Sequence, residues 1–342
     1  MFSKINDWLN TRFSKPEVGV LVCVVIIGII IIAFFGEMFA PILAGLVLAF
    51  LLESVVKFLQ RFVRFPRGLA VSVTYIAFCA LVVLALFLLL PALLRQLSQI
   101  VVQFPEMLNK FHMMLANLPN EYPRFFSQTF VNDVIQSTSL KNEKLPEIGK
   151  LLIALSWNSI PSIVTWIVYV VLVPLLTLYF LKDKLPIMKW VGDIMPKRRR
   201  LLDEVYSEMK HQLGRYVQGK FLEVIIVWIS AYVGFLIFDL KYAILLSFCV
   251  GLSSIIPYIG MVFVTIPVIF VGLLQWGLGS HFMYMFLVYL IIQTLDGSVL
   301  VPILFAGAVN LHPVAIIAAI LFFGGIWGFW GLLLAVPIAT FI

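Results

Sequence analysis

The last 101 residues of the chain, Tyr242–Ile342, contain one formally charged side chain, Asp296. A soluble domain needs a polar surface, and about a quarter of its residues are charged. A stretch of this length with a single charge cannot cover itself with such a surface. It is typical of helices that are surrounded by lipid.

The composition of the whole chain agrees with this interpretation. Of the 342 residues, 62% are hydrophobic and 12% are charged, and the mean hydropathy is +1.08. These values exclude a soluble enzyme and, despite the net charge of +7, a nucleic-acid-binding domain. The sequence therefore predicts an all-α, polytopic membrane protein with amphipathic helices at the interface.

Apolar runs of bilayer length and the wetter stretches between them predict five segments. The first two spans, Val18–Phe35 and Met38–Val56, are expected to be separated by a tight break at Gly36-Glu37. The five segments are 1–94 with spans 1–3, an extracytoplasmic amphipathic segment at 95–155, a fourth span at 156–181, a cytoplasmic amphipathic segment at 182–220, and a C-terminal membrane core with broken helices at 221–342.

The basic residues predict the orientation in the membrane. Of 24 Lys and Arg residues, 17 fall in the N-terminal segment, the 57–67 loop and the 182–220 segment. The positive-inside rule places these three segments, including the N-terminus, in the cytoplasm. Glu53 lies one helical turn before Lys57, and this spacing favours an ion pair at the interface over a coupling site.

Asp296 is the first candidate for a functional residue. A carboxylate within a membrane span is costly and commonly binds a proton or a cation, so we favour function over a position near the surface or at a helix end. Gln293 adds polar lining, while Gly297 and Pro302 are helix breakers that predict a discontinuous helix.

Two further interruptions of the last block are candidates. Pro257, Tyr258 and Gly260 lie between two half-length apolar arms, a pattern that favours a re-entrant hairpin over an ordinary kinked helix pair. A second turn contains Asn310, His312 and Pro313. His312 could carry protons, and an ordinary interfacial turn fits this pattern equally well.

The chain lacks the motifs of the common membrane enzymes. We find no phosphate loop, no HExxH, no GxSxG, and no Cys/His cluster for a metal or haem. No nucleophile–base pair is evident, so we predict a protein that is not an enzyme and needs no cofactor or metal.

The residues quoted above, with Leu181–Lys184, Leu311-His312-Pro313 and Gly324–Gly328, resemble the autoinducer-2 exporter family, in particular its PerM-type permeases. The resemblance implies a bacterial inner-membrane protein with about eight spans, some of them forming the hairpin or broken helices, and a homo-oligomer such as a pentamer. Some members are linked to export of autoinducer-2, and others resemble sodium– or lithium–proton antiporters. Members usually continue with a short basic tail, which implies further residues after Ile342.

We therefore expect a secondary transporter that exports a small solute, similar to autoinducer-2 by resemblance, and is driven by a proton or sodium gradient. Its partners would be the solute, the coupling cation and the lipid bilayer, with no nucleic acid. The alternatives are a passive channel and a membrane scaffold that transports nothing.

Overall fold

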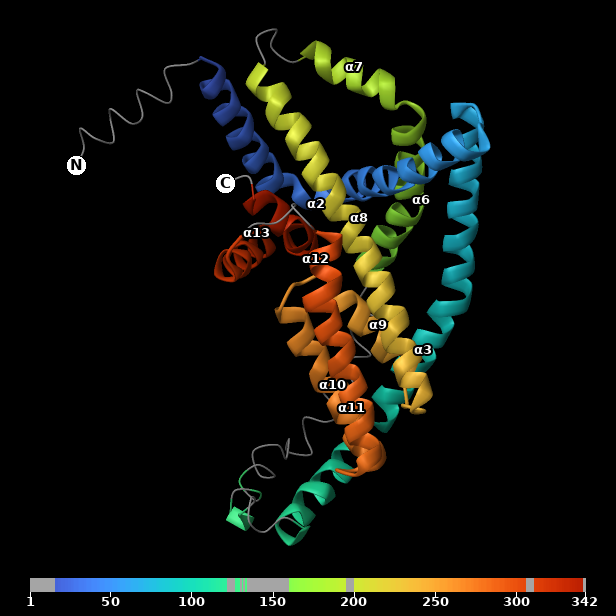
Figure 1. Cartoon of the computed structure of the whole chain (residues 1–342), viewed down its shortest axis with the longest axis vertical. Helices are drawn as coiled ribbons and strands as arrows, with labels where there is room; N and C mark the ends of the chain where they lie inside the picture. Colours follow the sequence, from blue (N-terminus) through green and yellow to red (C-terminus); the bar gives the residue numbers. More distant parts are fainter. Residues whose placement is uncertain are drawn as a thin grey trace, which may run out of the picture. The chain divides into compact units, whose positions relative to one another are not determined.

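The structure is a computed structural model that describes residues 16–121, 127–129, 131, 133, 160–194, 200–305 and 311–340. The elements within these residues are helices (Figure 1). In chain order they are α2 (Pro16–Phe58), η1 (Leu59–Val63), α3 (Arg67–Glu121), α6 (Ile160–Lys182), α7 (Lys184–Ile194), α8 (Arg200–Ile237), α9 (Ala243–Ser253), α10 (Ile259–Trp276), α11 (Ser280–Leu295), η2 (Asp296–Leu300), α12 (Val301–Leu304) and α13 (Pro313–Ala339). Both η1 and η2 are π-helical turns.

Six helical stretches of the described residues are long and apolar enough to cross a membrane. They are Met38–Val63, Arg67–Asn117, Gln212–Ile237, Ile259–Trp276, Ser280–Leu304 and Pro313–Ala339. Two shorter apolar helices are Tyr169–Lys182 and Ala243–Ser253. The prediction of an all-α, polytopic membrane protein is confirmed.

The chain forms two compact units. The first unit contains the described parts of Met1–Ala80, Val168–Leu222 and Val301–Ile342. The second unit contains those of Leu81–Ile167 and Glu223–Leu300. Both units are therefore assembled from segments that are far apart in the sequence.

The core of the first unit is a cluster of small and branched side chains. They come from α2, from the start of α3 and from the end of α6. The close approach of α6 to α2 is possible because Gly45 has no side chain: a Cβ atom there would lie 2.8 Å from the Cβ of Leu176. At the same crossing the Thr177 hydroxyl lies 3.3 Å from the Gly45 carbonyl oxygen. The core residues are Ala49, Leu52, Val56, Ala70, Val71 and Leu181.

The helix α2 corrects one prediction. The expected break at Gly36-Glu37 is wrong, because α2 continues through both residues and the helix merely changes direction part-way along (Figure 1). Pro41 lies inside this helix, and a proline both removes a backbone hydrogen bond and bends the helix. Gly36 packs against the indole ring of Trp327, so the glycine permits close contact instead of forming a turn. Likewise α3 is one helix across residues 94 and 95, where the sequence suggests a boundary between two segments.

The helix α13 is interrupted at Gly328, whose φ of 57° and ψ of −134° are not helical. Glycine reaches this conformation easily because it has no Cβ. The chain turns back there, as the two arms of α13 in Figure 1 show, and Gly331 lies directly against the carbonyl group of Phe323. The glycine-rich stretch therefore allows helical segments to pack closely.

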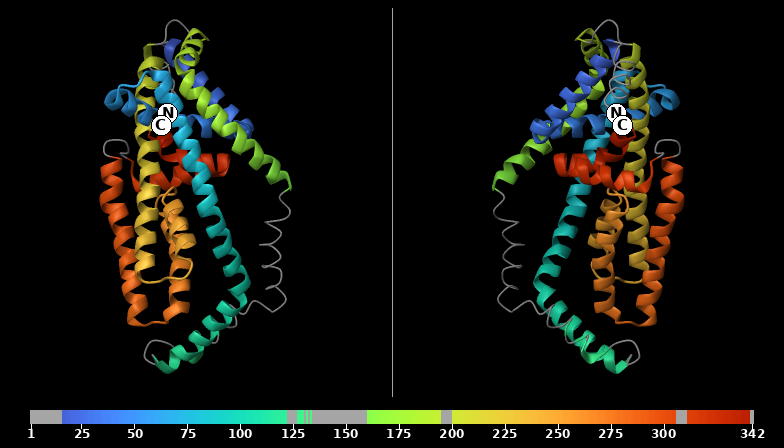
Figure 2. Two further views of the ribbon diagram at one scale, coloured as in Figure 1. Left: turned by 90° about the vertical axis from the view of Figure 1, so that its right-hand side faces the viewer. Right: turned by 90° about the vertical axis from the view of Figure 1, so that its left-hand side faces the viewer.

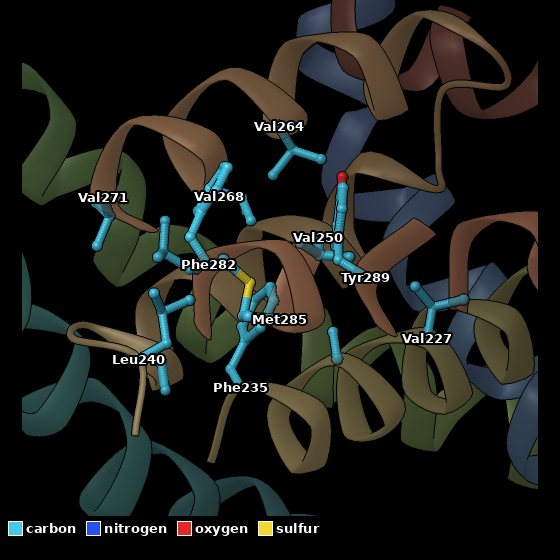
Figure 3. Close-up of a cluster of buried hydrophobic side chains, with 13 residues drawn as sticks. Val227, Phe235, Leu240, Val250, Val264, Val268, Val271, Phe282, Met285 and Tyr289 are labelled. Carbon is cyan, nitrogen blue, oxygen red and sulfur yellow. The ribbon is translucent and has the colours of Figure 1, made fainter. Parts of the chain in front are cut away.

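The second unit has a larger core of aliphatic and aromatic side chains (Figure 3). They come from the end of α8 and from α9, α10 and α11, which follow one another through short turns. Tyr242, the N-cap residue just before α9, donates a hydrogen bond of 2.6 Å to Gln103 of α3. Burial, and secondly the charge of Glu106, raise the pKa of Tyr242, so its hydroxyl stays protonated as a donor. The core residues are Val227, Ala231, Phe235, Leu240, Ala243, Leu246, Val250, Val264, Val268, Val271, Phe282, Met285 and Tyr289.

Candidate functional site

Asp296 lies at the point where α11 changes into the π-helical turn η2. The backbone stays helical through this point, and α11 continues directly into η2 (Figure 2). The discontinuous helix expected at Gly297 and Pro302 is therefore not observed: Gly297 lies in the wider π-helical turn and Pro302 lies inside the short α12. Such π turns inside α-helices occur frequently at functional sites.

Polar side chains and open space lie next to Asp296. The side chain of Asp296 is partly buried, while a Cβ placed on Gly297 would have no neighbour within 4 Å. The hydroxyl of Ser298 donates to the carbonyl oxygen of Thr294. A carboxylate, a hydroxyl and open space therefore occur together within one turn of a membrane-spanning helix.

Gln293 belongs to a line of hydrogen-bonded side chains that joins α10 and α11. Its amide nitrogen lies 2.8 Å from the hydroxyl of Tyr289, which lies 2.7 Å from the hydroxyl of Thr265 on α10. Thr265 in turn donates to the carbonyl oxygen of Met261 at 2.7 Å. The exposed fractions of Gln293 and Tyr289 are 7% and 1%, so this polar line is buried in the second unit.

Pro257 and Tyr258 lie in the turn of a helical hairpin between α9 and α10, and Gly260 is the second residue of α10. These two helices pack along each other, and Gly260 lies directly against the carbonyl group of Ser253. Tyr258 adopts a φ of 63°, which an L-residue rarely takes outside a tight turn. The hairpin geometry is thus in place, while its position in a bilayer stays a prediction.

The register of α10 and α11 brings this hairpin turn and Asp296 to the same end of the helix pair. A short turn joins the two helices, which therefore run antiparallel. Tyr258 precedes Thr265 by seven residues, and Asp296 follows Tyr289 by seven residues. Because Thr265 and Tyr289 are bonded, both sites lie two turns, or roughly 10 Å, beyond that bond in the same direction.

His312 and Pro313, the described residues of the second predicted turn, belong to the first unit. His312 caps the N-terminus of α13, with its Nδ1 accepting a hydrogen bond of 3.3 Å from the backbone N–H of Val314. Pro313 occupies the first turn of α13, where a proline is tolerated. Asn310 lies outside the described residues.

A cluster of three charged residues in the first unit is a feature that the sequence did not predict. The carboxylate of Glu53 is 2.7 Å from Lys184 Nζ and 3.5 Å from Arg67 Nη2. Arg67 also donates to the carbonyl oxygen of Leu181 at 3.2 Å. The predicted pairing with Lys57 is wrong. Among the described residues no ion pair joins Lys57 to Glu53, and the cations that reach the Glu53 carboxylate are Arg67 and Lys184, from other helices.

Two more charged side chains are buried in α8. Lys220, which the sequence places at the end of the cytoplasmic segment, is 4% exposed and lies 5.4 Å from the centre of the Phe305 ring. Glu223, three residues later in the same helix, is 2% exposed. Glu223 could have been identified from the sequence, because it is the one acidic residue inside the apolar run at 221–238.

A profile described as "AI-2E family transporter" matches residues 20–342. The chain belongs to this family of transporters. The "Putative permease PerM" of Escherichia coli K12 is 40% identical over 342 residues, which cover 100% of this chain and 96% of that protein. The "Putative transport protein YueF" of Bacillus subtilis 168 is 26% identical and covers 98% of this chain and 91% of its own length. A "Putative transport protein" of Thermotoga maritima is 24% identical, with coverages of 93% and 90%.

Membership of the AI-2E family assigns the chain to the multi-pass membrane transporters. It agrees with the apolar helices of both units, and the names of these relatives indicate transport and no enzymatic reaction. In the described residues, no group of three or more His, Cys, Asp or Glu side chains is arranged to hold a metal ion.

Proposed function

We propose that the chain is a secondary transporter of the bacterial inner membrane that exports a small polar solute. The energy would come from a proton or sodium gradient, and Asp296 would bind the coupling ion. The observation that carries the proposal is the position of this carboxylate. It lies at a π turn of a membrane-spanning helix, one turn after the buried Gln293 and at the level of the Pro257 hairpin turn.

The family supports the solute class only in outline. The description of the family refers to AI-2, so a small hydrophilic signal similar to autoinducer-2 is the first solute to test. The described part of the last block contains no arginine or lysine after Lys241, which argues against a tightly clamped anion there.

The proposal is tested in everted membrane vesicles that contain the full chain. Solute uptake is measured with an imposed proton or sodium gradient, for the native chain and for Asp296→Asn. Gradient-driven uptake should fall to the level of vesicles without the protein. The matched control is Asp239→Asn, since Asp239 is exposed and its φ of 52° is one that asparagine adopts readily.

The two rival functions give different results in this assay. A passive channel would let the solute pass without any gradient, with Asp296→Asn as active as the native chain. A scaffold would show no flux under any condition. Either result contradicts gradient-coupled transport.

The orientation and assembly are parts of the same proposal. The basic residues support a cytoplasmic N-terminus, 57–67 loop and 182–220 segment. A homo-oligomer is supported by the family resemblance alone. Protease protection of an N-terminal tag in vesicles tests the orientation, and native mass spectrometry of the purified chain tests the assembly.

A further inference from the structure

The hydrogen bonds of the polar line determine which way the Gln293 amide faces. Thr265 has one hydroxyl proton, which it donates to Met261. Its oxygen must therefore accept the proton of Tyr289, whose oxygen is left to accept from Gln293. The only donor on Gln293 is its amide nitrogen, so its carbonyl oxygen points away from Tyr289.

The packing of Tyr289 holds this arrangement in place. Its ring stacks against Phe235 and Phe286, with centroid distances of 6.1 and 6.2 Å. Figure 3 shows the ring inside the buried cluster, with the hydroxyl beside Val264. With a reversed amide, either the bond between Gln293 and Tyr289 or the bond from Thr265 to Met261 would be lost, and an unmade hydrogen bond in a buried site costs more than in water.

The oriented amide lies one turn from Asp296. Side chains three residues apart lie on the same face of a helix, so Gln293 and Asp296 share one face of α11 and η2. Next to them, Gly297 borders open space. One carboxylate and a neutral oxygen match the charge and the oxygen preference of a hard monovalent cation.

We propose that Gln293 and Asp296 are ligands of a monovalent metal cation, with Na⁺ as the first candidate, and that Tyr289 and Thr265 are positioning residues for the Gln293 oxygen. A proton alone would need only the carboxylate and would leave the oriented amide without a role. The inference rests on the proposed function, and it identifies the class of the coupling ion.

The test uses the detergent-purified full chain and sodium alone as the probe. Thermal unfolding is followed as NaCl replaces choline chloride at constant ionic strength, which gives a half-saturating sodium concentration. Tyr289→Phe and Thr265→Val keep the shape of each side chain and should each raise that concentration about fivefold, the effect of one lost hydrogen bond. Tyr284→Phe, on the exposed face of α11, is the matched control and should leave it unchanged.

Transport in proteoliposomes separates positioning from general damage. A positioning role raises the half-saturating sodium concentration of Tyr289→Phe and leaves the maximal rate near that of the native chain. The inference is wrong if Tyr289→Phe resembles Tyr284→Phe, or if only the maximal rate falls. Should Tyr289→Phe not fold, Thr265→Val gives the same decision.

The same measurements distinguish this inference from the proposed function. If native vesicles couple transport to a proton gradient and sodium has no specific effect on unfolding or transport, the metal site is excluded and the transporter proposal stands. If no gradient drives transport, the proposed function itself fails.

Discussion

The Nζ atom of Lys184 lies 2.7 Å from Oε1 of Glu53, although the two residues are 131 positions apart. Glu53 is near the end of α2, and Lys184 is the first residue of α7. Arg67, the first residue of α3, reaches the other carboxylate oxygen at 3.5 Å. This one carboxylate therefore ties together the ends of three helical segments of the first unit.

Removing the ammonium group of Lys184 should destabilise the first unit. In Lys184→Met the largely buried Glu53 carboxylate loses its shortest hydrogen bond, and Arg67 alone remains to balance its charge. We expect the free energy of unfolding to fall by about 1–2 kcal/mol, since Lys184 itself is partly exposed and its ion pair is partly screened. Equilibrium unfolding in mixed detergent micelles measures this change.

The matched control for that prediction is Lys57→Met. Lys57 is exposed and lies one turn after Glu53, where the sequence alone would place the partner. Equal losses of stability for the two variants would contradict the importance of the Lys184 contact. The double variant Glu53→Gln with Lys184→Met should be more stable than Lys184→Met, because it removes the uncompensated charge.

A methyl group at Gly260 should force open the hairpin between α9 and α10. A Cβ there would overlap the carbonyl group of Ser253, whereas at Gly325 of α13 it would have no neighbour within 4 Å. We expect Gly260→Ala to lose about 1–3 kcal/mol of stability, the usual cost of overpacking, and Gly325→Ala to lose little. Thermal unfolding of both purified variants, compared by size-exclusion profile, tests this difference.

Local sequence patterns were enough to select Asp296 as a candidate and to predict the turn at Pro257. A charge in a 101-residue apolar block is visible without a structure, and so are prolines and glycines between half-length arms. The membrane fold follows as well, because the apolar interior of a bilayer requires helices that satisfy their own backbone. The break predicted at Gly36 is wrong, because this glycine instead allows close contact with Trp327.

The partners of polar residues could not be predicted in the same way. Glu53 has a basic residue one turn away, and only the tertiary fold shows that Lys184 and Arg67 replace it. Tyr289 looks like an ordinary core residue in its apolar run. Its hydroxyl forms a hydrogen bond with Thr265 only because α10 and α11 pack in an antiparallel register, which the sequence does not show.

Substitutions of His312 should distinguish a helix cap from a proton carrier. His312→Asn keeps a side chain that can accept from the Val314 N–H and should retain both stability and transport. His312→Ala loses the cap and should cost about 1 kcal/mol of stability. If His312→Asn folds normally and yet loses transport, the histidine acts as a proton carrier and the capping explanation is insufficient.

The burial of Lys220 leads to a difference in chemical accessibility. In a chain whose three native cysteines are replaced, Lys220→Cys should react much more slowly with a membrane-impermeant maleimide in everted vesicles than Lys57→Cys. The reason is that Lys220 is 4% exposed and packs over Phe305, whereas Lys57 is exposed.

The control for this prediction is Phe305→Cys, at a position that is 8% exposed, which should react as slowly as Lys220→Cys. Both variants must elute as the native chain does on size exclusion. Rapid labelling at positions 220 and 57 alike would show that this part of α8 is open to water, and Lys220 would then count among the solvated basic residues of the 182–220 segment.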